Sequence, residues 1–122
     1  MAVTPESRLE KAANLLESDN EEDWRSAAHA AYYACYYLAT KIQEIERTPV
    51  YSDTGSHQGL ISGFADAGKP RLRKIAIMLG QLKQARVAAD YDPDEDFSQR
   101  KAETAVATAN RLRAYILEVY KL

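Results

Sequence analysis

The amino-acid sequence predicts an all-α fold, an up-and-down antiparallel four-helix bundle with one additional short helix. Three observations support this fold class. Apolar residues recur at three- and four-residue steps in four long segments, which is the spacing of one helix face. No segment alternates polar and apolar residues through a β-branched run, as a half-buried strand would. The connections between the segments are short, which favours antiparallel packing of neighbours. The 122 residues are expected to form a single domain, residues 1–122.

The first helix is expected to begin at Thr4-Pro5-Glu6, because Thr can cap the helix, Pro suits its first turn and Glu complements its dipole. It should end near Ser18. The acidic segment 19–23 then supplies a cap and a first turn for the second helix. Pro49 forbids much continuation, so the second helix should end at about Arg47.

The second helix is the most unusual part of the chain. From Ser26 to Thr40 it carries no Asp, Glu, Lys or Arg, but it holds four tyrosines, a histidine and the single cysteine. Surface helices normally have a charged back, so we expect more than one face of this helix to be covered. The rest of the chain should cover one side, and a second copy or a ligand the other. Its apolar stripe comprises Trp24, Ala28, Ala31, Cys35, Leu38, Ile42 and Ile45.

Three further elements follow a loop at residues 48–56. Ser56 is expected to cap a short third helix that stops at Gly68, and two internal glycines weaken this helix and predict a mobile element. A fourth helix begins after Lys69-Pro70 and is broken at residues 91–94, and a fifth begins near Ser98. The fourth helix has the stripe Leu72, Ile75, Leu79, Leu82 and Ala89, and the fifth has Ala102, Ala105, Ala109, Leu112, Ile116 and Val119.

The composition excludes several classes of function. Sixteen basic and eighteen acidic residues give a net charge of −2, so any RNA contact needs a local basic patch. One cysteine excludes an internal disulfide framework and suits a reducing cytosol. Two histidines and one cysteine without close spacing argue against a zinc site, and no metal or organic cofactor is expected. No segment has signal-peptide character or the length to cross a bilayer, so we expect a cytoplasmic protein.

The second helix also carries the candidate chemistry. Arg25 and His29 lie one turn apart on one face, either as a surface or interface pair or as tentative catalytic residues. The tyrosines around His29 suit the core and a dimer interface, and the alternative is that they stack on bases or on a nucleotide. These tyrosines are Tyr32, Tyr33, Tyr36 and Tyr37.

Two clusters on the fourth helix are polar. Arg86 interrupts the apolar stripe, so it should pair with Asp90 one turn later; with Tyr91 this forms a structural polar group. A basic cluster at the start of this helix is either a solvated face or a phosphate contact; it comprises Lys69, Arg71, Arg73 and Lys74.

The acidic segment near the end of the helix lacks the glycine and the terminal glutamate of a calcium loop, so it indicates capping and a solvated turn. Its acidic residues are Asp90, Asp92, Asp94, Glu95 and Asp96. His57 is either a polar first-turn residue or part of an unspecific phosphate site at a helix N-terminus.

The order of these segments resembles the HEPN domain family (higher eukaryotes and prokaryotes nucleotide-binding). The matching segments are Ser26 to Leu38, Ser56 to Ile61, Arg86 to Tyr91 and Lys101 to Leu117, which together span most of the chain. The resemblance implies a helical bundle that dimerises, and we expect the homodimer to form through the second helix. It also implies a ribonuclease, a toxin–antitoxin component beside a small nucleotidyltransferase, or a non-catalytic module that binds RNA or a nucleotide.

This sequence departs from the pattern of the catalytic members of that family. Those members share an arginine followed, after four to six residues, by a histidine. Alignment on the Ala-Tyr-Tyr-Ala run puts Ala30 and Tyr37 at those two positions. Alanine has no charge, and tyrosine titrates near 10, which makes it a poor base at neutral pH. We therefore predict a non-catalytic or weakly catalytic HEPN module that binds RNA, a nucleotide or a protein partner, within a toxin–antitoxin or defence operon. The alternatives are a metal-independent ribonuclease using Arg25 and His29 across a dimer, and a dimeric scaffold without a ligand.

Overall fold

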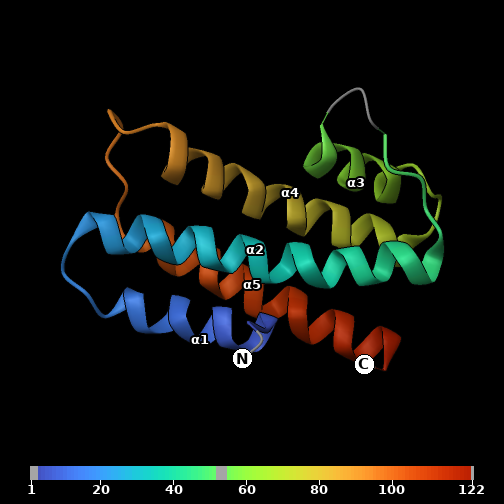
Figure 1. Cartoon of the computed structure of the whole chain (residues 1–122), viewed down its shortest axis with the longest axis horizontal. Coiled ribbons are helices and arrows are strands. Elements are labelled where there is room, and N and C mark those ends of the chain that lie inside the picture. Colours follow the sequence, from blue (N-terminus) through green and yellow to red (C-terminus); the bar gives the residue numbers. More distant parts are fainter. Residues whose placement is uncertain (1–2, 52–54, 122) are drawn as a thin grey trace.

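The computed structural model describes residues 3–51 and 55–121, and these residues form five helices and no strand. Successive long helices run in opposite directions along the longest axis of the molecule, and the short helix α3 lies above the first half of α4 (Figure 1). The all-α prediction is confirmed. The helices are α1 (Pro5–Leu16), α2 (Glu21–Glu46), α3 (Ser56–Ala65), α4 (Pro70–Tyr91) and α5 (Gln99–Tyr120).

The helix starts follow from local capping. Thr4 accepts a hydrogen bond from the backbone N–H of Ser7, and the Ser7 hydroxyl accepts one from the backbone of Thr4, which completes a capping box for α1. The Asn20 side chain caps α2 by accepting from the N–H of Asp23, and Ser98 caps α5 in the same way. α2 ends where Arg47 takes the left-handed conformation, with φ 55°.

The third helix differs from the sequence-based expectation at its start. Ser56 is the first helical residue and not the cap; Gly55 is the cap residue, at φ 88°, and no side chain caps this helix. The two internal glycines have a packing reason. A Cβ at Gly59 would lie 2.0 Å from the carbonyl oxygen of Tyr51, and one at Gly63 would lie 1.9 Å from that of Pro49. The segment 49–51 therefore crosses α3 so closely that only glycine fits there.

The core is organised around α2, which packs against α1, α4 and α5 along its length. Most of the predicted α2 stripe is buried, but Ile45 at its end is 54% exposed. The stripes of α4 and α5 are buried except for Val119, which is 36% exposed. Alanines fill much of the α2 surface, which lets the surrounding helices approach closely. Across residues 3–51 and 55–121, no helix has both the length and the apolar character needed to span a bilayer.

Candidate functional site

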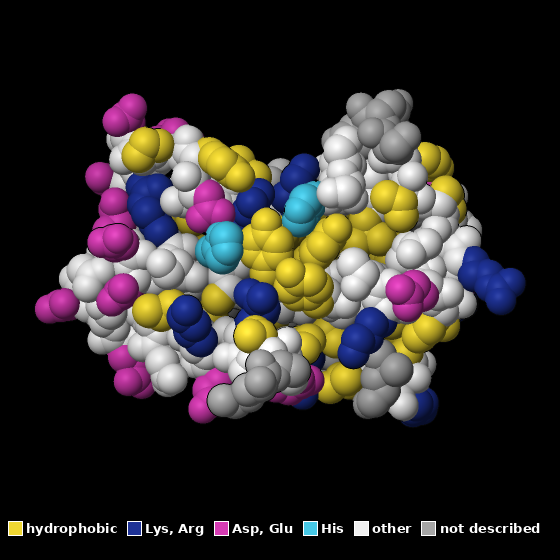
Figure 2. All heavy atoms as spheres, viewed as in Figure 1, with side chains coloured by type: hydrophobic (Ala, Val, Ile, Leu, Met, Phe, Trp, Pro, Cys, Tyr) yellow, Lys and Arg dark blue, Asp and Glu magenta, His cyan; other side chains and the backbone are white. Residues whose placement is uncertain are grey.

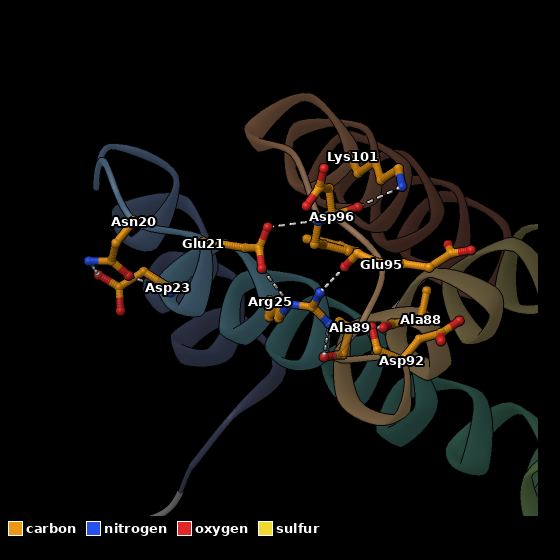
Figure 3. A network of polar contacts seen from close by, with 11 residues as sticks. Asn20, Glu21, Asp23, Arg25, Ala88, Ala89, Asp92, Glu95, Asp96 and Lys101 are labelled. Carbon is orange, nitrogen blue, oxygen red and sulfur yellow. Dashed lines mark hydrogen bonds and ion pairs between the residues drawn. The ribbon is translucent and has the colours of Figure 1, made fainter.

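Arg25 is held by the end of α4 and the segment that follows it. Its side chain is 15% exposed and points from α2 toward this segment (Figure 3). The last carbonyls of a helix have no partner within the helix, and a guanidinium satisfies several of them at once. Nη1 donates to the carbonyl oxygens of Ala88 (3.2 Å), Ala89 (3.0 Å) and Asp92 (3.2 Å), and Nη2 donates to that of Glu95.

Glu21 completes this Arg25 network from the preceding turn of α2. Its carboxylate accepts from Nε of Arg25 at 3.3 Å and from the backbone N–H of Phe97 at 2.9 Å (Figure 3). The Phe97 N–H, and then Arg25, lower the pKa of Glu21 below its ordinary value. Each nitrogen of the Arg25 guanidinium therefore has a partner within the chain. In this arrangement Arg25 fixes the connection between α4 and α5 and does not present its charge to a ligand.

His29 lies one turn further along α2 and has different partners. Its side chain is 44% exposed, and Nδ1 is 2.7 Å from Oδ2 of Asp90 near the end of α4. Because an ionised carboxylate only accepts hydrogen bonds, Nδ1 carries the proton in this pair. Neutral His29 then has a free lone pair on Nε2. Arg25 and His29 therefore lie on one helix but have different partners: Arg25 contacts backbone carbonyls, and His29 contacts the carboxylate of Asp90.

Arg86 connects Asp90 to the tyrosines of α2. Nε lies 3.1 Å from Oδ2 of Asp90 as an ion pair, although the N–H is not aligned well enough to make a hydrogen bond. Nη2 donates to the hydroxyls of Tyr33 (2.9 Å) and Tyr91 (3.3 Å). The guanidinium carbon also lies 5.9 Å from the ring centroid of Tyr32, 5.3 Å from that of Tyr33 and 5.1 Å from that of Tyr91. The pairing of Arg86 with Asp90 expected from their spacing is present in the structure.

His57 joins the same cluster from the first turn of α3. Its Nδ1 lies 2.6 Å from the hydroxyl of Tyr32, and its ring centroid lies 4.2 Å from that of Tyr36. Burial, and then the charges of Arg86 and Lys83, lower the pKa of His57. Burial raises the pKa of the Tyr32 hydroxyl, so this phenol stays protonated and can donate to Nδ1. When Tyr32 donates to Nδ1, the proton of the neutral imidazole is on Nε2.

These side chains form one aromatic surface, which we call the His–Tyr face, made of His29, Tyr33, Tyr36, Tyr37 and His57. The rings touch in series: His29 to Tyr33 at 4.7 Å, Tyr33 to Tyr36 at 6.2 Å and Tyr36 to Tyr37 at 6.0 Å between centroids. Figure 2 shows the two histidine side chains on one face, with hydrophobic side chains between them and basic side chains close by. Tyr37 is 44% exposed, whereas Tyr32 is fully buried and belongs to the core below this face.

A groove of about 810 Å³ adjoins the His–Tyr face. It lies between α1, α2 and the end of α4, and we call it the His29 groove. Arg8 additionally lies over the ring of Tyr37, with its guanidinium carbon 5.1 Å from the ring centroid. The groove thus brings two cations of α1 beside the exposed imidazole. Its polar lining comprises Ser7, Arg8, Lys11, Glu22, Arg25, Ser26, His29 and Asp90.

The basic cluster at the start of α4 is largely engaged by Glu46. This carboxylate accepts from Arg71 at 2.6 and 3.1 Å and from Lys69 at 3.0 Å, and also from the Tyr120 hydroxyl at 2.7 Å. The Arg71 contact, with those of Tyr120 and Lys69, lowers the pKa of Glu46 to about 2. The node ties the end of α2 to the start of α4 and the end of α5. Arg73 is exposed and lies outside this node.

Sequence reasoning did not foresee the contribution of Arg8 or the position of His57. Arg8 comes from a helix that shows only an ordinary amphipathic pattern, so no local signal marks it. The Ser-His-x-Gly-Leu-Ile segment was part of the family resemblance, and its histidine was the available signal for His57. In the described part of the chain, no group of three or more His, Cys, Asp or Glu side chains is arranged to hold a metal ion.

Comparisons with known proteins identify the family. The sequence model of the HEPN domain matches residues 5–119, which is nearly the whole chain. No curated protein and no solved structure gives a significant match. The helical fold, the aromatic second helix and the match over residues 5–119 together place the chain, which belongs to the HEPN domain family.

Proposed function

We propose that this HEPN domain binds single-stranded RNA on the His–Tyr face without cleaving it. The observation that carries the proposal is the combination of a continuous aromatic surface with the His29 groove beside it. Aromatic side chains stack on bases without regard to sequence, and a neighbouring positively charged groove follows the phosphates. Here the aromatic surface and the groove adjoin each other through His29, and the groove carries the cations Arg8 and Lys11 together with the carboxylates of Glu22 and Asp90.

The aromatic part of the proposal rests on Tyr36, Tyr37 and His57. Tyr37 is 44% exposed at the edge of the cluster, and the rings of Tyr36 and His57 lie 4.2 Å apart between centroids. A base can therefore stack on Tyr37 while its edge meets the neutral His57, whose Nε2 donates hydrogen bonds. Arg86 contacts the neighbouring ring of Tyr33 and keeps it in position through a 2.9 Å hydrogen bond to its hydroxyl.

The phosphate contacts are assigned to the His29 groove. Arg8 and Lys11 line one wall, and the hydroxyl of Ser26 adds a donor without charge. Of the basic cluster of α4, Lys69 and Arg71 are already paired with Glu46, whereas Arg73 is exposed outside that node. An RNA strand on this face would therefore contact the α1 cations before Lys69 and Arg71.

The proposal is of binding rather than cleavage, for two reasons. Ala30 and Tyr37 occupy the positions at which catalytic members of the family have arginine and histidine. The other candidate arginine, Arg25, has each guanidinium nitrogen engaged by Glu21 or by backbone carbonyls. A phosphate could reach this guanidinium only if the connection between α4 and α5 were released.

One observation favours the alternative, a metal-independent ribonuclease. Asp90 holds Nδ1 of His29 at 2.7 Å, which is how a carboxylate orients a catalytic imidazole. Nε2 of His29 would remove the proton from a ribose 2′-hydroxyl as that oxygen attacks the adjacent phosphorus. The 5′-oxygen would leave with a proton from solvent. In this version Arg86, or an arginine of a second copy, replaces Arg25 as the cation near the site.

Fluorescence anisotropy with a labelled single-stranded RNA tests the binding proposal. Tyr37→Ala should weaken binding about fivefold or more, because a lost base stack costs about 1–3 kcal/mol. Tyr51→Ala is the matched control, since Tyr51 is also exposed but lies outside the His–Tyr face. A second substitution tests the phosphate contacts. Arg8→Gln should reduce the salt dependence of RNA binding by the amount expected for about one lost phosphate contact, whereas Arg100→Gln on α5 should leave that salt dependence unchanged. RNA binding that none of these substitutions changes would overturn the proposal, and no binding at all would leave the scaffold alternative.

The same RNA, followed on a denaturing gel, separates binding from cleavage. We expect the intact strand to persist with the wild-type protein. Cleavage that disappears in His29→Ala and persists in Arg25→Lys would replace the binding proposal with the ribonuclease alternative.

The family match also supports a small nucleotidyltransferase of a toxin–antitoxin or defence operon as a protein partner. Co-expression of the two chains tests this, and failure to co-purify would remove it.

A further inference from the structure

A groove of about 740 Å³ lies between α4 and α5, and we call it the α4–α5 groove. It shares no lining residue with the His29 groove, so it is a separate site. Its α5 wall runs from Lys101 to Arg111, which is about 15 Å of helix. Its volume lies within the range of roughly 300–1,000 Å³ that is usual for small-molecule sites.

The floor of the α4–α5 groove is apolar. It is formed by the buried side chains of Leu82, Phe97 and Ala105. Ala85 and Ala88 extend this apolar surface along α4, and both are partly exposed. Their small side chains leave space above the backbone of the helix. An extended hydrocarbon chain can therefore lie along the floor and be removed from water.

Phe97 lies at the end of the groove near the start of α5, and its position is fixed. Its backbone N–H donates to Glu21 at 2.9 Å, and the guanidinium carbon of Arg25 lies 5.5 Å from its ring centroid. Nζ of Lys101 lies 6.0 Å from the same centroid and donates to the carbonyl oxygen of Asp96 at 3.0 Å. This end of the groove is therefore preformed, and the Lys101 ammonium already has a partner there.

The other end of the groove offers hydrogen-bond donors to an anion. Nη2 of Arg111 donates to Oγ1 of Thr108 at 3.4 Å, and Arg111 makes no ion pair within residues 3–51 and 55–121. Thr108 is 5% exposed, and within the same residues its hydroxyl donates to no acceptor. Because α4 and α5 run in opposite directions (Figure 1), Gln81 lines the groove at this end too. A carboxylate placed here can accept from the guanidinium and the hydroxyl at once.

The charges of the lining favour a negatively charged ligand. Arg100, Lys101 and Arg111 line the groove, and none of the described residues that line it is acidic. The His29 groove differs, because Glu22 and Asp90 are part of its lining. The whole chain has a net charge of −2, so the α4–α5 groove is a local positive region on a weakly acidic protein. A ligand that matches the groove therefore combines a negative charge with an apolar body.

We propose that the α4–α5 groove binds a single-chain amphiphilic carboxylate of the fatty-acid class. The carboxylate lies at Arg111 and Thr108, and the hydrocarbon chain follows the floor toward Phe97. A small polar anion would leave this floor exposed to water, and an uncharged hydrocarbon would leave the donors of Arg111 and Thr108 unused. The site is independent of RNA binding on the His–Tyr face, so either proposal can fail without the other.

Titration of the isotope-labelled protein with sodium decanoate, below its micelle concentration, tests the proposal by NMR. We expect saturable shifts of the Leu82 methyl and Phe97 ring signals. Decanoate should bind more tightly than octanoate, by about three- to fourfold for each additional CH₂ group that is buried. Decyltrimethylammonium, which has the same chain and a positive head group, should leave these signals unchanged. No saturable shift with decanoate, or equal binding of the two decyl amphiphiles, would overturn the proposal.

Two substitutions separate the head-group contact from the hydrocarbon contact. Arg111→Gln should weaken decanoate binding about tenfold, because a hydrogen bond to a charged group is lost. Arg113→Gln is the matched control and should leave binding unchanged, since Arg113 lies outside the groove and pairs with Glu6. Thr104 is exposed and lines the groove between its two ends. Thr104→Trp should therefore cover the floor and abolish decanoate binding while the melting temperature stays unchanged.

Adenosine monophosphate is the second probe, because it carries negative charge without a hydrocarbon chain. It should not shift the Leu82 and Phe97 signals. Shifts with adenosine monophosphate and none with decanoate would assign the groove to a nucleotide and overturn the proposal. Decanoate affinity that stays unchanged in either Arg111→Gln or Thr104→Trp would overturn it as well.

Discussion

Arg25 of α2 lies against the last turn of α4, Arg86 belongs to α4 near the same end, and their side chains are nearly equally shielded, at 15% and 14% exposed. Their partners differ in kind. Arg25 is surrounded by backbone carbonyls and one carboxylate, whereas Arg86 lies among tyrosine rings and shares Asp90 with an exposed histidine. A guanidinium that satisfies orphan carbonyls fixes the chain path. A guanidinium that holds aromatic and imidazole side chains in place orders a surface to which a ligand can bind. Burial alone therefore does not distinguish a structural arginine from a functional one.

The largest expected effect is on stability, from Arg25→Ala. This change removes the side-chain donor to the carbonyls of Ala88, Ala89, Asp92 and Glu95, of which that of Asp92 keeps the N–H of Glu95, and it frees the connection between α4 and α5. We expect the free energy of unfolding in urea to fall by about 3 kcal/mol, because several charge-assisted hydrogen bonds are lost together. Arg100→Ala on the exposed side of α5 should change it by less than about 0.5 kcal/mol. RNA binding per folded molecule should be unchanged by Arg25→Ala; a selective loss of binding would give Arg25 a functional role.

Arg86→Met should have a smaller effect on stability and a clear effect on binding. Methionine keeps much of the side-chain volume but loses the cation that lies between Asp90 and the rings of Tyr32, Tyr33 and Tyr91. We expect a loss of about 2 kcal/mol in the free energy of unfolding. Anisotropy at a temperature where the variant is fully folded should find weaker RNA binding, because Tyr33 and Asp90 lose their common partner. Unchanged binding would mean that Arg86 is only a packing residue.

The smallest effect is a difference in pH dependence between the two regions. Burial lowers the pKa of His57 from its ordinary 6.5, so protonation favours the unfolded chain. The contribution of His57 to stability is then complete above about pH 6.5 and is lost as the pH falls through its folded pKa. Glu21 in the Arg25 network also has a lowered pKa, so its contribution is complete above its ordinary 4.5 and is lost below that. The His–Tyr face should therefore weaken at a higher pH than the Arg25 network.

Urea unfolding between pH 7.5 and pH 5, for the wild type and His57→Gln, checks this difference. The wild type should lose stability across this range, and His57→Gln should lose less of it. Glu21→Gln should keep the wild-type slope between pH 7.5 and pH 5, because the Glu21 carboxylate titrates below that range. The same slope in wild type and His57→Gln would contradict the assignment of this pH dependence to His57.

The prediction from sequence succeeded where interactions are local. Helix starts at Thr4 and Ser98, and the Arg86–Asp90 pair, all depend on residues three or four positions apart. It was wrong at Ser56, because the start of α3 is set by the path of the chain through Gly55 and not by a capping side chain. The glycines of α3 weaken it as an isolated helix, and only the crossing segment 49–51 explains why they are there.

The sequence by itself determined five helices, their approximate ends and the family to which the chain belongs. Those properties follow from apolar periodicity, capping and residue order, which depend only on residues close together in the sequence. Only the tertiary structure decided what each polar side chain does. Arg25 reaches carbonyls 63 to 70 residues away, and Tyr32 meets His57 across 25 residues. Such contacts depend on the rotation of each helix about its own axis when the helices pack together. The spacing of residues within one helix does not determine that rotation.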